Sequence, residues 1–177
     1  MKKLMLVAAL MLMSVGVFAQ GKVAIGANAG VALYGDGYNP FGFGAKLQYE
    51  FVENVRAELG YNYWLPKDKA GLMDFNLNLQ YLIPLSDNVN IYPMVGGNLA
   101  MTHGDAVKAL LDKQQTIFGF QGGLGIEFYV AENVKLNVDA KYQYNKKTKE
   151  FTDRGTIHKQ EMKYNGPVFM AGIAYVF

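Results

Sequence analysis

The feature of this sequence that most constrains its fold is a strict alternation of apolar and polar residues on both sides of a short turn, between residues 41 and 65. The apolar positions are odd-numbered before the turn, from Phe41 to Phe51, and remain odd-numbered after it, from Val55 to Tyr63. A period of two residues places alternate side chains on opposite faces of a β-strand, whereas a helix would mix them. The segment therefore predicts two antiparallel strands, 41–51 and 55–65, each with one apolar and one polar face.

The matching parity also fixes the register of this hairpin. Phe51 and Val55 share a face if residues 52–54 form a three-residue loop, which suits a type I turn that ends with Asn54 in the left-handed conformation. The polar faces of the two strands should then carry their own cross-strand contacts. The expected contacts are Glu50 with Arg56, Gln48 with Glu58, and Lys46 with Glu58.

The same turn pattern recurs at residues 85–89 and 130–134, so the chain is expected to be a meander of hairpins. The period of two predicts eight strands, at residues 22–34, 41–51, 55–65, 73–85, 89–101, 115–130, 134–145 and 163–177. Between them, three short turns alternate with long connections at residues 35–40, 66–72, 102–114 and 146–162. Within the third long connection, residues 105–113 have an N-cap residue and an apolar stripe that predict a short helix.

The distribution of large and small residues decides which face of the predicted barrel is inside. The apolar face carries the aromatic residues, whereas the polar face carries most of the glycines, such as Gly123 and Gly125. An eight-stranded barrel has room inside only for modest side chains, so the glycine-rich, charged face belongs inside and the aromatic face meets lipid. The outward aromatic residues gather at the strand ends, as the two girdles of a membrane barrel do, which disfavours the alternative of a soluble, lipocalin-like barrel.

The amino terminus has the pattern of a secretory signal peptide. Lys2 and Lys3 precede an apolar run of about 14 residues, and small residues precede Gln20. The run is shorter than the roughly 20 residues of a membrane-spanning helix, which is the alternative. We therefore expect residues 1–19 to be removed and residues 20–177 to form one barrel domain. The chain has no Cys, which excludes disulfides, thiol chemistry and a lipid-modified amino terminus.

The mature chain is electrically balanced, because removal of Lys2 and Lys3 leaves 15 basic and 15 acidic residues. Nine of the charges fall on the inward face, and we expect them to pair with one another, since an unpaired buried ion costs several kcal/mol. A polar network that plugs the lumen is favoured over an ion pathway. The predicted network consists of Lys46, Glu50, Arg56, Glu58, Asp74, Glu127, Lys135, Asp139 and Lys141.

The last strand carries a terminal pattern of Gly172, an aromatic residue at Tyr175 and a terminal Phe177. With this strand and its meander, the chain resembles the small eight-stranded outer-membrane β-barrel proteins of Gram-negative bacteria, similar to the OmpA transmembrane domain and to OmpX within the porin-like families. The resemblance implies that these three residues form the signal read by the barrel assembly machinery, although Ala171 departs from the polar residue usual before that Gly. It also implies an all-β, antiparallel up-and-down transmembrane β-barrel in the cell outer membrane, with short periplasmic turns and longer extracellular loops.

The sequence contains little that could support catalysis. Its two histidines, His103 and His158, lie in long connections, and His103 with Asp105 is a weak metal signal. We expect no catalytic site, no cofactor, no metal site and no nucleic-acid partner. The predicted function is a structural or surface-interaction role for a monomer, in membrane integrity, adhesion or ligand contact. The alternatives are a lipid-modifying barrel enzyme and a narrow diffusion channel.

The last long connection is the most distinctive outer segment. Residues 152–155, Thr-Asp-Arg-Gly, favour a turn, so the flanking strands are expected to continue as a protruding hairpin. Such a hairpin would present a free backbone edge to a surface ligand or host partner. The alternative is a disordered loop. Its basic residues outnumber its acids and are candidates to contact lipopolysaccharide phosphates, the alternative being a solvated loop. These residues are Lys146, Lys147, Lys149, Arg154 and Lys159, with Lys163 at the base.

Overall fold

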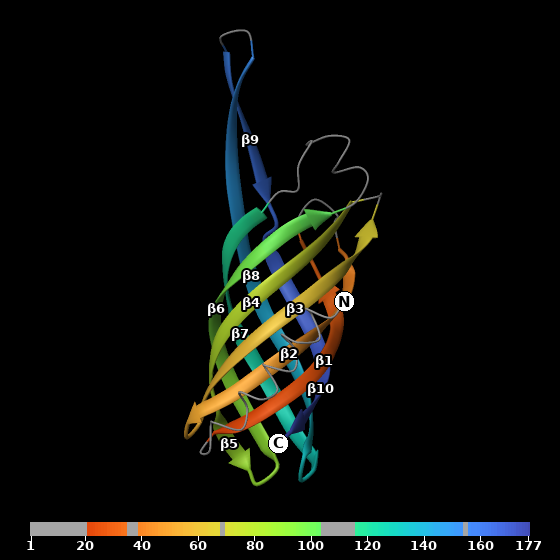
Figure 1. The fold of residues 1–177 in the computed structure, drawn as a ribbon, viewed down its shortest axis with the longest axis vertical. Coiled ribbons are helices and arrows are strands. Elements are labelled where there is room, and N and C mark those ends of the chain that lie inside the picture. The colour runs from red at the N-terminus through yellow and green to blue at the C-terminus, as the bar shows by residue number, and fades with distance from the viewer. Residues whose placement is uncertain (1–20, 35–38, 68–69, 104–115, 154–155) are drawn as a thin grey trace, which may run out of the picture.

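The computed structural model of the protein describes residues 21–34, 39–67, 70–103, 116–153 and 156–177. The predicted signal peptide, the predicted helix at 105–113 and Arg154 lie outside these residues. The described residues form ten strands (Figure 1). They are β1 (Lys22–Ala32), β2 (Phe41–Val52), β3 (Val55–Lys67), β4 (Ala70–Tyr81), β5 (Ile83–Ser86), β6 (Val89–His103), β7 (Thr116–Ala131), β8 (Val134–Asp153), β9 (Thr156–Lys163) and β10 (Gly166–Val176).

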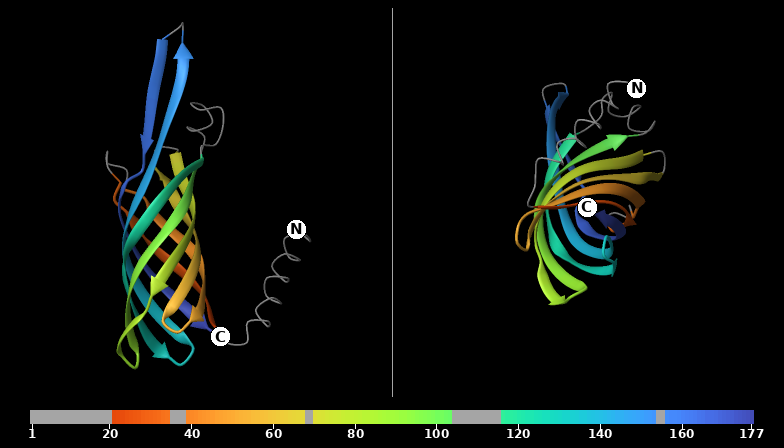
Figure 2. Two further views of the ribbon diagram at one scale, coloured as in Figure 1. Left: turned by 90° about the vertical axis from the view of Figure 1, so that its left-hand side faces the viewer. Right: turned by 60° about the horizontal axis from the view of Figure 1, so that its bottom comes forward.

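The strands close into an antiparallel barrel. Along the wall the strands pair in the order β1–β2–β3–β4–β6–β7–β8, and β10 pairs with both β8 and β1, which leaves the wall without a free edge. The short strand β5 extends the wall beside β6, and β9 pairs with β8 as a hairpin that rises beyond the barrel (Figure 2). The predicted eight-stranded up-and-down barrel is confirmed. We call the end that carries the three short turns the turn end, and the opposite end, beyond which the hairpin rises, the loop end.

The first hairpin has the predicted register but a tighter turn. Glu50 pairs with Arg56 and Asn54 has a φ of 64°, as expected. The predicted three-residue loop is wrong, because Val52 joins the ladder opposite Val55 and the register shifts between Glu50 and Val52. The turns after β5 and β7 show the same shift. A bulge of this kind absorbs one extra residue on one strand and leaves the facing parity of the rest unchanged.

Two strand boundaries also differ from the predictions. The predicted strand 73–85 breaks at Leu82, whose backbone N–H donates to the carbonyl of Asn54 at 2.7 Å. Pro84, which cannot donate to a ladder, follows within β5. The predicted connection 66–72 is mostly strand, because β3 runs to Lys67 and β4 starts at Ala70.

The predicted hairpin at the loop end is confirmed by the β8–β9 ladder, which reaches Asp153 opposite Thr156. The predicted strand 163–177 starts three residues late, at Gly166, because Asn145 binds the intervening pair. The side chain of Asn165 accepts from the Asn145 backbone N–H at 2.8 Å, and the Asn145 side chain donates to the Tyr164 carbonyl at 3.1 Å. These bonds separate the hairpin from the barrel wall.

The two faces of the wall follow the predicted alternation. Outward aromatic side chains such as Phe41 and Tyr175 are about half exposed, at 50% and 49% of their surface. Most glycines of the wall face inward at close contacts, and a Cβ at Gly125 would overlap the ring of Tyr92. Among the described residues, no helix is long and apolar enough to cross a membrane.

Candidate functional site

The interior of the barrel holds three zones along its axis. A network of charged residues lies nearest the turn end, a layer of Asn and Gln side chains follows, and an apolar cluster lies near the loop end. Each zone is built from inward-facing alternate residues of several strands, because the period of two brings every second side chain to the axis.

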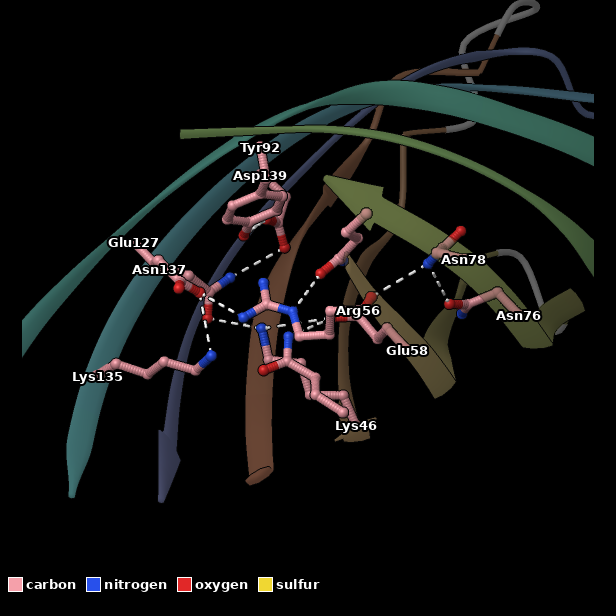
Figure 3. Close-up of polar contacts among 12 residues, drawn as sticks. Lys46, Arg56, Glu58, Asn76, Asn78, Tyr92, Glu127, Lys135, Asn137 and Asp139 are labelled. Carbon is pink, nitrogen blue, oxygen red and sulfur yellow. Dashed lines mark hydrogen bonds and ion pairs between the residues drawn. The ribbon is translucent and has the colours of Figure 1, made fainter. Parts of the chain in front are cut away.

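The centre of the charged network is Glu127, which is fully buried on β7. One of its carboxylate oxygens accepts from Arg56 Nη1 at 2.8 Å and from Lys135 Nζ at 3.1 Å, and the other accepts from Asn90 Nδ2 at 3.0 Å. Figure 3 shows Arg56 and Lys135 converging on this carboxylate. Arg56 also donates through Nε to Gln80 at 2.7 Å. One anion therefore holds two cations from opposite sides of the narrow lumen.

A second carboxylate, Glu58, is held mainly by amides. It accepts from Gln48 at 2.7 Å and from Asn78 at 3.1 Å, and its ion pair with Lys46 is longer, at 4.0 Å. Lys46 donates to Asn137 at 2.6 Å, so the predicted diagonal pair is present but shares its lysine.

A third carboxylate, Asp139, accepts from the hydroxyl of Tyr92 and from Asn137 at 2.9 Å. The ring of Tyr92 lies beneath the Arg56 guanidinium, with 5.0 Å from Cζ to the ring centroid. Lys141, two residues beyond Asp139 on the same face of β8, is also buried in the interior. The three carboxylates are thus linked into one network by shared cations and amides.

The middle zone consists of neutral amides that sequence reasoning did not single out. Gln121 donates to Asn78 at 2.5 Å and accepts from Gln143 at 2.9 Å, and Gln143 accepts from the Tyr34 hydroxyl at 2.5 Å. These residues have the same parity as the predicted charges, and this signal could have identified them.

Asp74 connects the amide zone to the apolar cluster. It accepts from Asn62 at 3.1 Å, from Asn76 at 3.0 Å and from the indole N–H of Trp64 at 2.6 Å. Trp64 is fully buried at the centre of an apolar cluster contributed by six strands, with Tyr164 packed against it. The cluster consists of Ala32, Tyr34, Trp64, Leu72, Ala100, Ile117, Val168 and Met170. This apolar filling near the loop end was not expected from the polar character of the inward face.

One predicted network residue has a different partner. Glu50 is only half-buried, and its carboxylate accepts from the backbone N–H of Asn54 at 3.4 Å in the turn. The expected Glu50–Arg56 ion pair is wrong, because the long Arg56 side chain reaches across the lumen to Glu127. The other eight predicted charges are buried in the interior. They are Lys46, Arg56, Glu58, Asp74, Glu127, Lys135, Asp139 and Lys141.

The remaining sequence candidates lie outside this network. Gly172 pairs with Asn28 on β1, and the rings of Tyr175 and Phe177 project outward with centroids 5.0 Å apart. The basic residues occupy the hairpin: Lys146 is exposed, Lys147 and Lys149 follow on β8, Lys159 lies opposite Glu150 on β9, and Lys163 lies opposite Lys146.

The two histidines occupy separate positions. His103 ends β6 opposite Gly71, whereas His158 pairs with Phe151 in the hairpin. Asp105, the other half of the weak metal signal, lies outside the described residues. Within the ranges that the structure describes, no group of three or more His, Asp and Glu residues is placed to hold a metal ion.

A cavity of about 820 Å³ lies at the turn end, below the charged network. Its lining includes Glu50, Asn90 and Tyr129, together with residues of the three short turns. Above it, buried side chains fill the amide and apolar zones.

The sequence model of a known family, described as the outer membrane protein beta-barrel domain, matches residues 5–177. The chain belongs to this family. It is therefore an outer-membrane β-barrel protein, in agreement with the resemblance carried by its terminal strand. No curated protein matches the sequence significantly.

Solved structures of outer-membrane barrels share the fold of this family member. Neisserial surface protein A superposes with a TM-score of 0.66 at 18% identity, over 89% of this chain and 97% of that one. The N-terminal β-barrel domain of Pseudomonas aeruginosa OprF gives 0.61 at 16% identity, over 89% and 100%. OprG from Pseudomonas aeruginosa gives 0.60 at 17% identity, over 89% and 95%. At these identities the similarity establishes the fold.

Proposed function

We propose that this outer-membrane barrel is a closed, non-conducting protein with a structural or surface-interaction role, acting through the segments at its loop end. The observation that carries the proposal is the filled interior. From Glu127 to Trp64, buried side chains joined by hydrogen bonds and ion pairs occupy the lumen.

A diffusion channel would need a continuous water column, and two features oppose one. For water to pass the charged network, Glu127 would have to part from Arg56 and Lys135. Breaking a buried ion pair costs about 3–5 kcal/mol. The apolar cluster would also have to part, although Trp64, Ile117 and Val168 are each at most 1% exposed. The polar network therefore acts as a plug.

The loop end supplies a surface for interaction. The β8–β9 hairpin extends beyond the wall and carries an excess of lysines. Its backbone edge and its positive charge suit two kinds of partner, a strand of a surface ligand or host protein and the phosphates of lipopolysaccharide. We expect the protein to act there as a monomer, with the loop end outside the cell.

The biogenesis that fits this role is export through a cleaved signal peptide at residues 1–19 and insertion by the barrel assembly machinery. Gly172, Tyr175 and Phe177 would form the recognition signal, since the aromatic pair projects from the last strand at the turn end.

The alternative function is a lipid-modifying enzyme. An enzyme of that kind needs a nucleophile, a base and an acid within hydrogen-bond reach of one another. His103 and His158 belong to different ladders, at the rim and within the hairpin. The proposal is therefore a non-enzymatic role.

The proposed role is tested in a deletion strain complemented with two forms of the protein. One is wild type and the other has residues 147–162 replaced by a two-residue turn. The proposal predicts that both forms insert in the outer membrane, while only wild type restores detergent resistance and surface binding. Full restoration by the truncated form would contradict a role for the hairpin.

A further inference from the structure

The β8–β9 hairpin joins the barrel wall at one short junction. The β8–β10 ladder of the wall ends at Gln143 opposite Gly166, and the β8–β9 ladder of the hairpin begins at Lys146 opposite Lys163. Three residues forward along β8 correspond to three residues back along the opposite strand. The register is therefore the same on both sides of the junction, and the hairpin continues the wall without a slip.

Within the junction, two Asn side chains take the place of one backbone hydrogen bond. The Tyr164 N–H donates to the Asn145 carbonyl at 3.1 Å, as in a regular ladder. The reciprocal bond of a regular pair would run from the Asn145 N–H to the Tyr164 carbonyl. Here the Asn145 N–H donates to the Asn165 side-chain oxygen at 2.8 Å, and the Asn145 side chain donates to the Tyr164 carbonyl at 3.1 Å. These side-chain bonds compete with the ladder and interrupt the strand at Tyr164 and Asn165.

The junction is also anchored in the barrel interior. Asn145 is fully buried, and a Cβ at Gly119 on β7 would overlap its side-chain oxygen, so this glycine leaves the room that Asn145 occupies. The ring of Tyr164 meets the ring of Tyr34 edge to face, with centroids 6.2 Å apart, and packs against the apolar cluster. The base of the hairpin is thus held by backbone, side-chain and ring contacts together.

We propose that Asn145 and Asn165 form an elbow that holds the β8–β9 hairpin at one angle to the barrel, so that the hairpin meets its surface partner as a pre-oriented element. Figure 2 shows the hairpin rising beyond the wall from this junction. The inference rests on the proposed surface role of the hairpin and deepens it by naming the residues that position the binding segment.

The elbow matters because a two-stranded hairpin is at best marginally stable on its own. A hairpin with a loose base would sample many directions, and a partner would have to select one of them. A segment that is already oriented loses less conformational freedom on binding, which raises the affinity. Asn145 and Asn165 are therefore positioning residues, which act through the hairpin backbone.

The test is the backbone order parameter of the hairpin, measured by ¹⁵N NMR relaxation on the full-length folded protein in detergent micelles. The reporters are the amides of Lys149 and Lys159 in the β8–β9 ladder, and Leu124 in the wall is the internal reference. Asn165→Ala removes the side-chain acceptor, whereas Asn165→Asp keeps an acceptor oxygen in its place.

The matched control is Asn88→Ala, which changes an exposed Asn in a turn at the opposite end of the barrel. A gel-mobility shift on heating confirms that each variant is folded before it is measured.

We expect order parameters of about 0.85 for the hairpin in wild type, in Asn165→Asp and in Asn88→Ala, as for the wall. In Asn165→Ala the hairpin values should fall below about 0.6, while Leu124 keeps its value. Hairpin values below about 0.6 in wild type would overturn the elbow, because they would show a freely swinging hairpin. Equal hairpin values in wild type and Asn165→Ala would overturn the role of Asn165.

Slower swings are read as the width of an electron spin resonance distance distribution between spin labels. The labels are placed at Lys149→Cys in the hairpin and Leu47→Cys on the outer wall, since the chain has no Cys of its own. The elbow predicts a distribution as narrow as that between two wall positions, Leu47→Cys and Leu124→Cys, and one roughly twofold broader after Asn165→Ala. A hairpin distribution that is already this broad with Asn165 in place would contradict the elbow.

These measurements need no partner, so the elbow and the surface role can fail separately. A mobile hairpin would overturn the elbow and leave the surface role to the deletion strain. Full restoration of that strain by the truncated form would overturn the surface role and leave the elbow standing.

Discussion

Replacing Glu127 by Ala tests the charged network at its centre. The change removes the acceptor of Arg56 and Lys135 and leaves two cations in the interior, where both residues are at most 3% exposed. Breaking a buried pair by removing one partner costs about 3–5 kcal/mol, and Asn90 loses a hydrogen bond worth roughly 1 kcal/mol. Together these costs predict a loss of about 4–6 kcal/mol in the free energy of unfolding.

The measurement is urea unfolding of the protein in lipid vesicles, followed by the fluorescence of Trp64, the one Trp in the sequence. Trp64 is fully buried, so its emission reports loss of the interior. With a slope of about 2 kcal/mol per molar urea, the midpoint should fall by roughly 2–3 M.

The matched control is Glu132→Ala, which removes an exposed carboxylate in the turn between β7 and β8. This surface change should alter the free energy of unfolding by at most about 0.5 kcal/mol. Equal midpoints for Glu127→Ala and Glu132→Ala would refute the assignment of Glu127 as the anion that neutralises the lumen.

Three further outcomes follow from individual contacts. Gly125→Ala should destabilise the barrel by about 1–3 kcal/mol, because the added Cβ would overlap the Tyr92 ring. In the same unfolding assay Gly122→Ala should be nearly neutral, because a Cβ there would lie 3.5 Å from its nearest atom, the Met94 carbonyl oxygen. Asn54→Ala should lower the free energy of unfolding by about 1 kcal/mol, because Ala is strained at a φ of 64°, whereas Asn54→Gly should not lower it. Equal unfolding midpoints for these two variants would contradict the turn geometry. Slow amide hydrogen exchange at Lys149 by NMR is expected for a hairpin in which it pairs with β9, and exchange within seconds would argue for a disordered loop.

The strands and their register could be predicted from the sequence because each depends on a local rule. Parity alone places Glu50 opposite Arg56. The glycine-rich face is predicted to point inward and the aromatic face outward, because the interior has little room. The bulges that tighten the three turns escaped prediction, because an extra residue in a turn leaves the parity on either side unchanged.

The contacts in the lumen could not be predicted in the same way. Arg56 and Glu127 are 71 positions apart in the chain, and they meet because the closed barrel brings β3 and β7 to opposite sides of one narrow axis. Trp64 has the parity of Arg56 and Glu58, so its inward direction was predictable. Its convergence with Leu72 and Ile117 depends on the stagger of the closed sheet, which pairwise registers do not reveal.

The most direct test of the closed interior is electrical. Purified full-length protein is incorporated into planar lipid bilayers, and the current is recorded under an applied potential, with Glu127→Ala as the comparison. The filled lumen predicts that wild type gives no stepwise conductance above that of the bilayer alone. Reproducible current steps that scale with the amount of wild-type protein and change in size in Glu127→Ala would show an open path through the network and contradict the account.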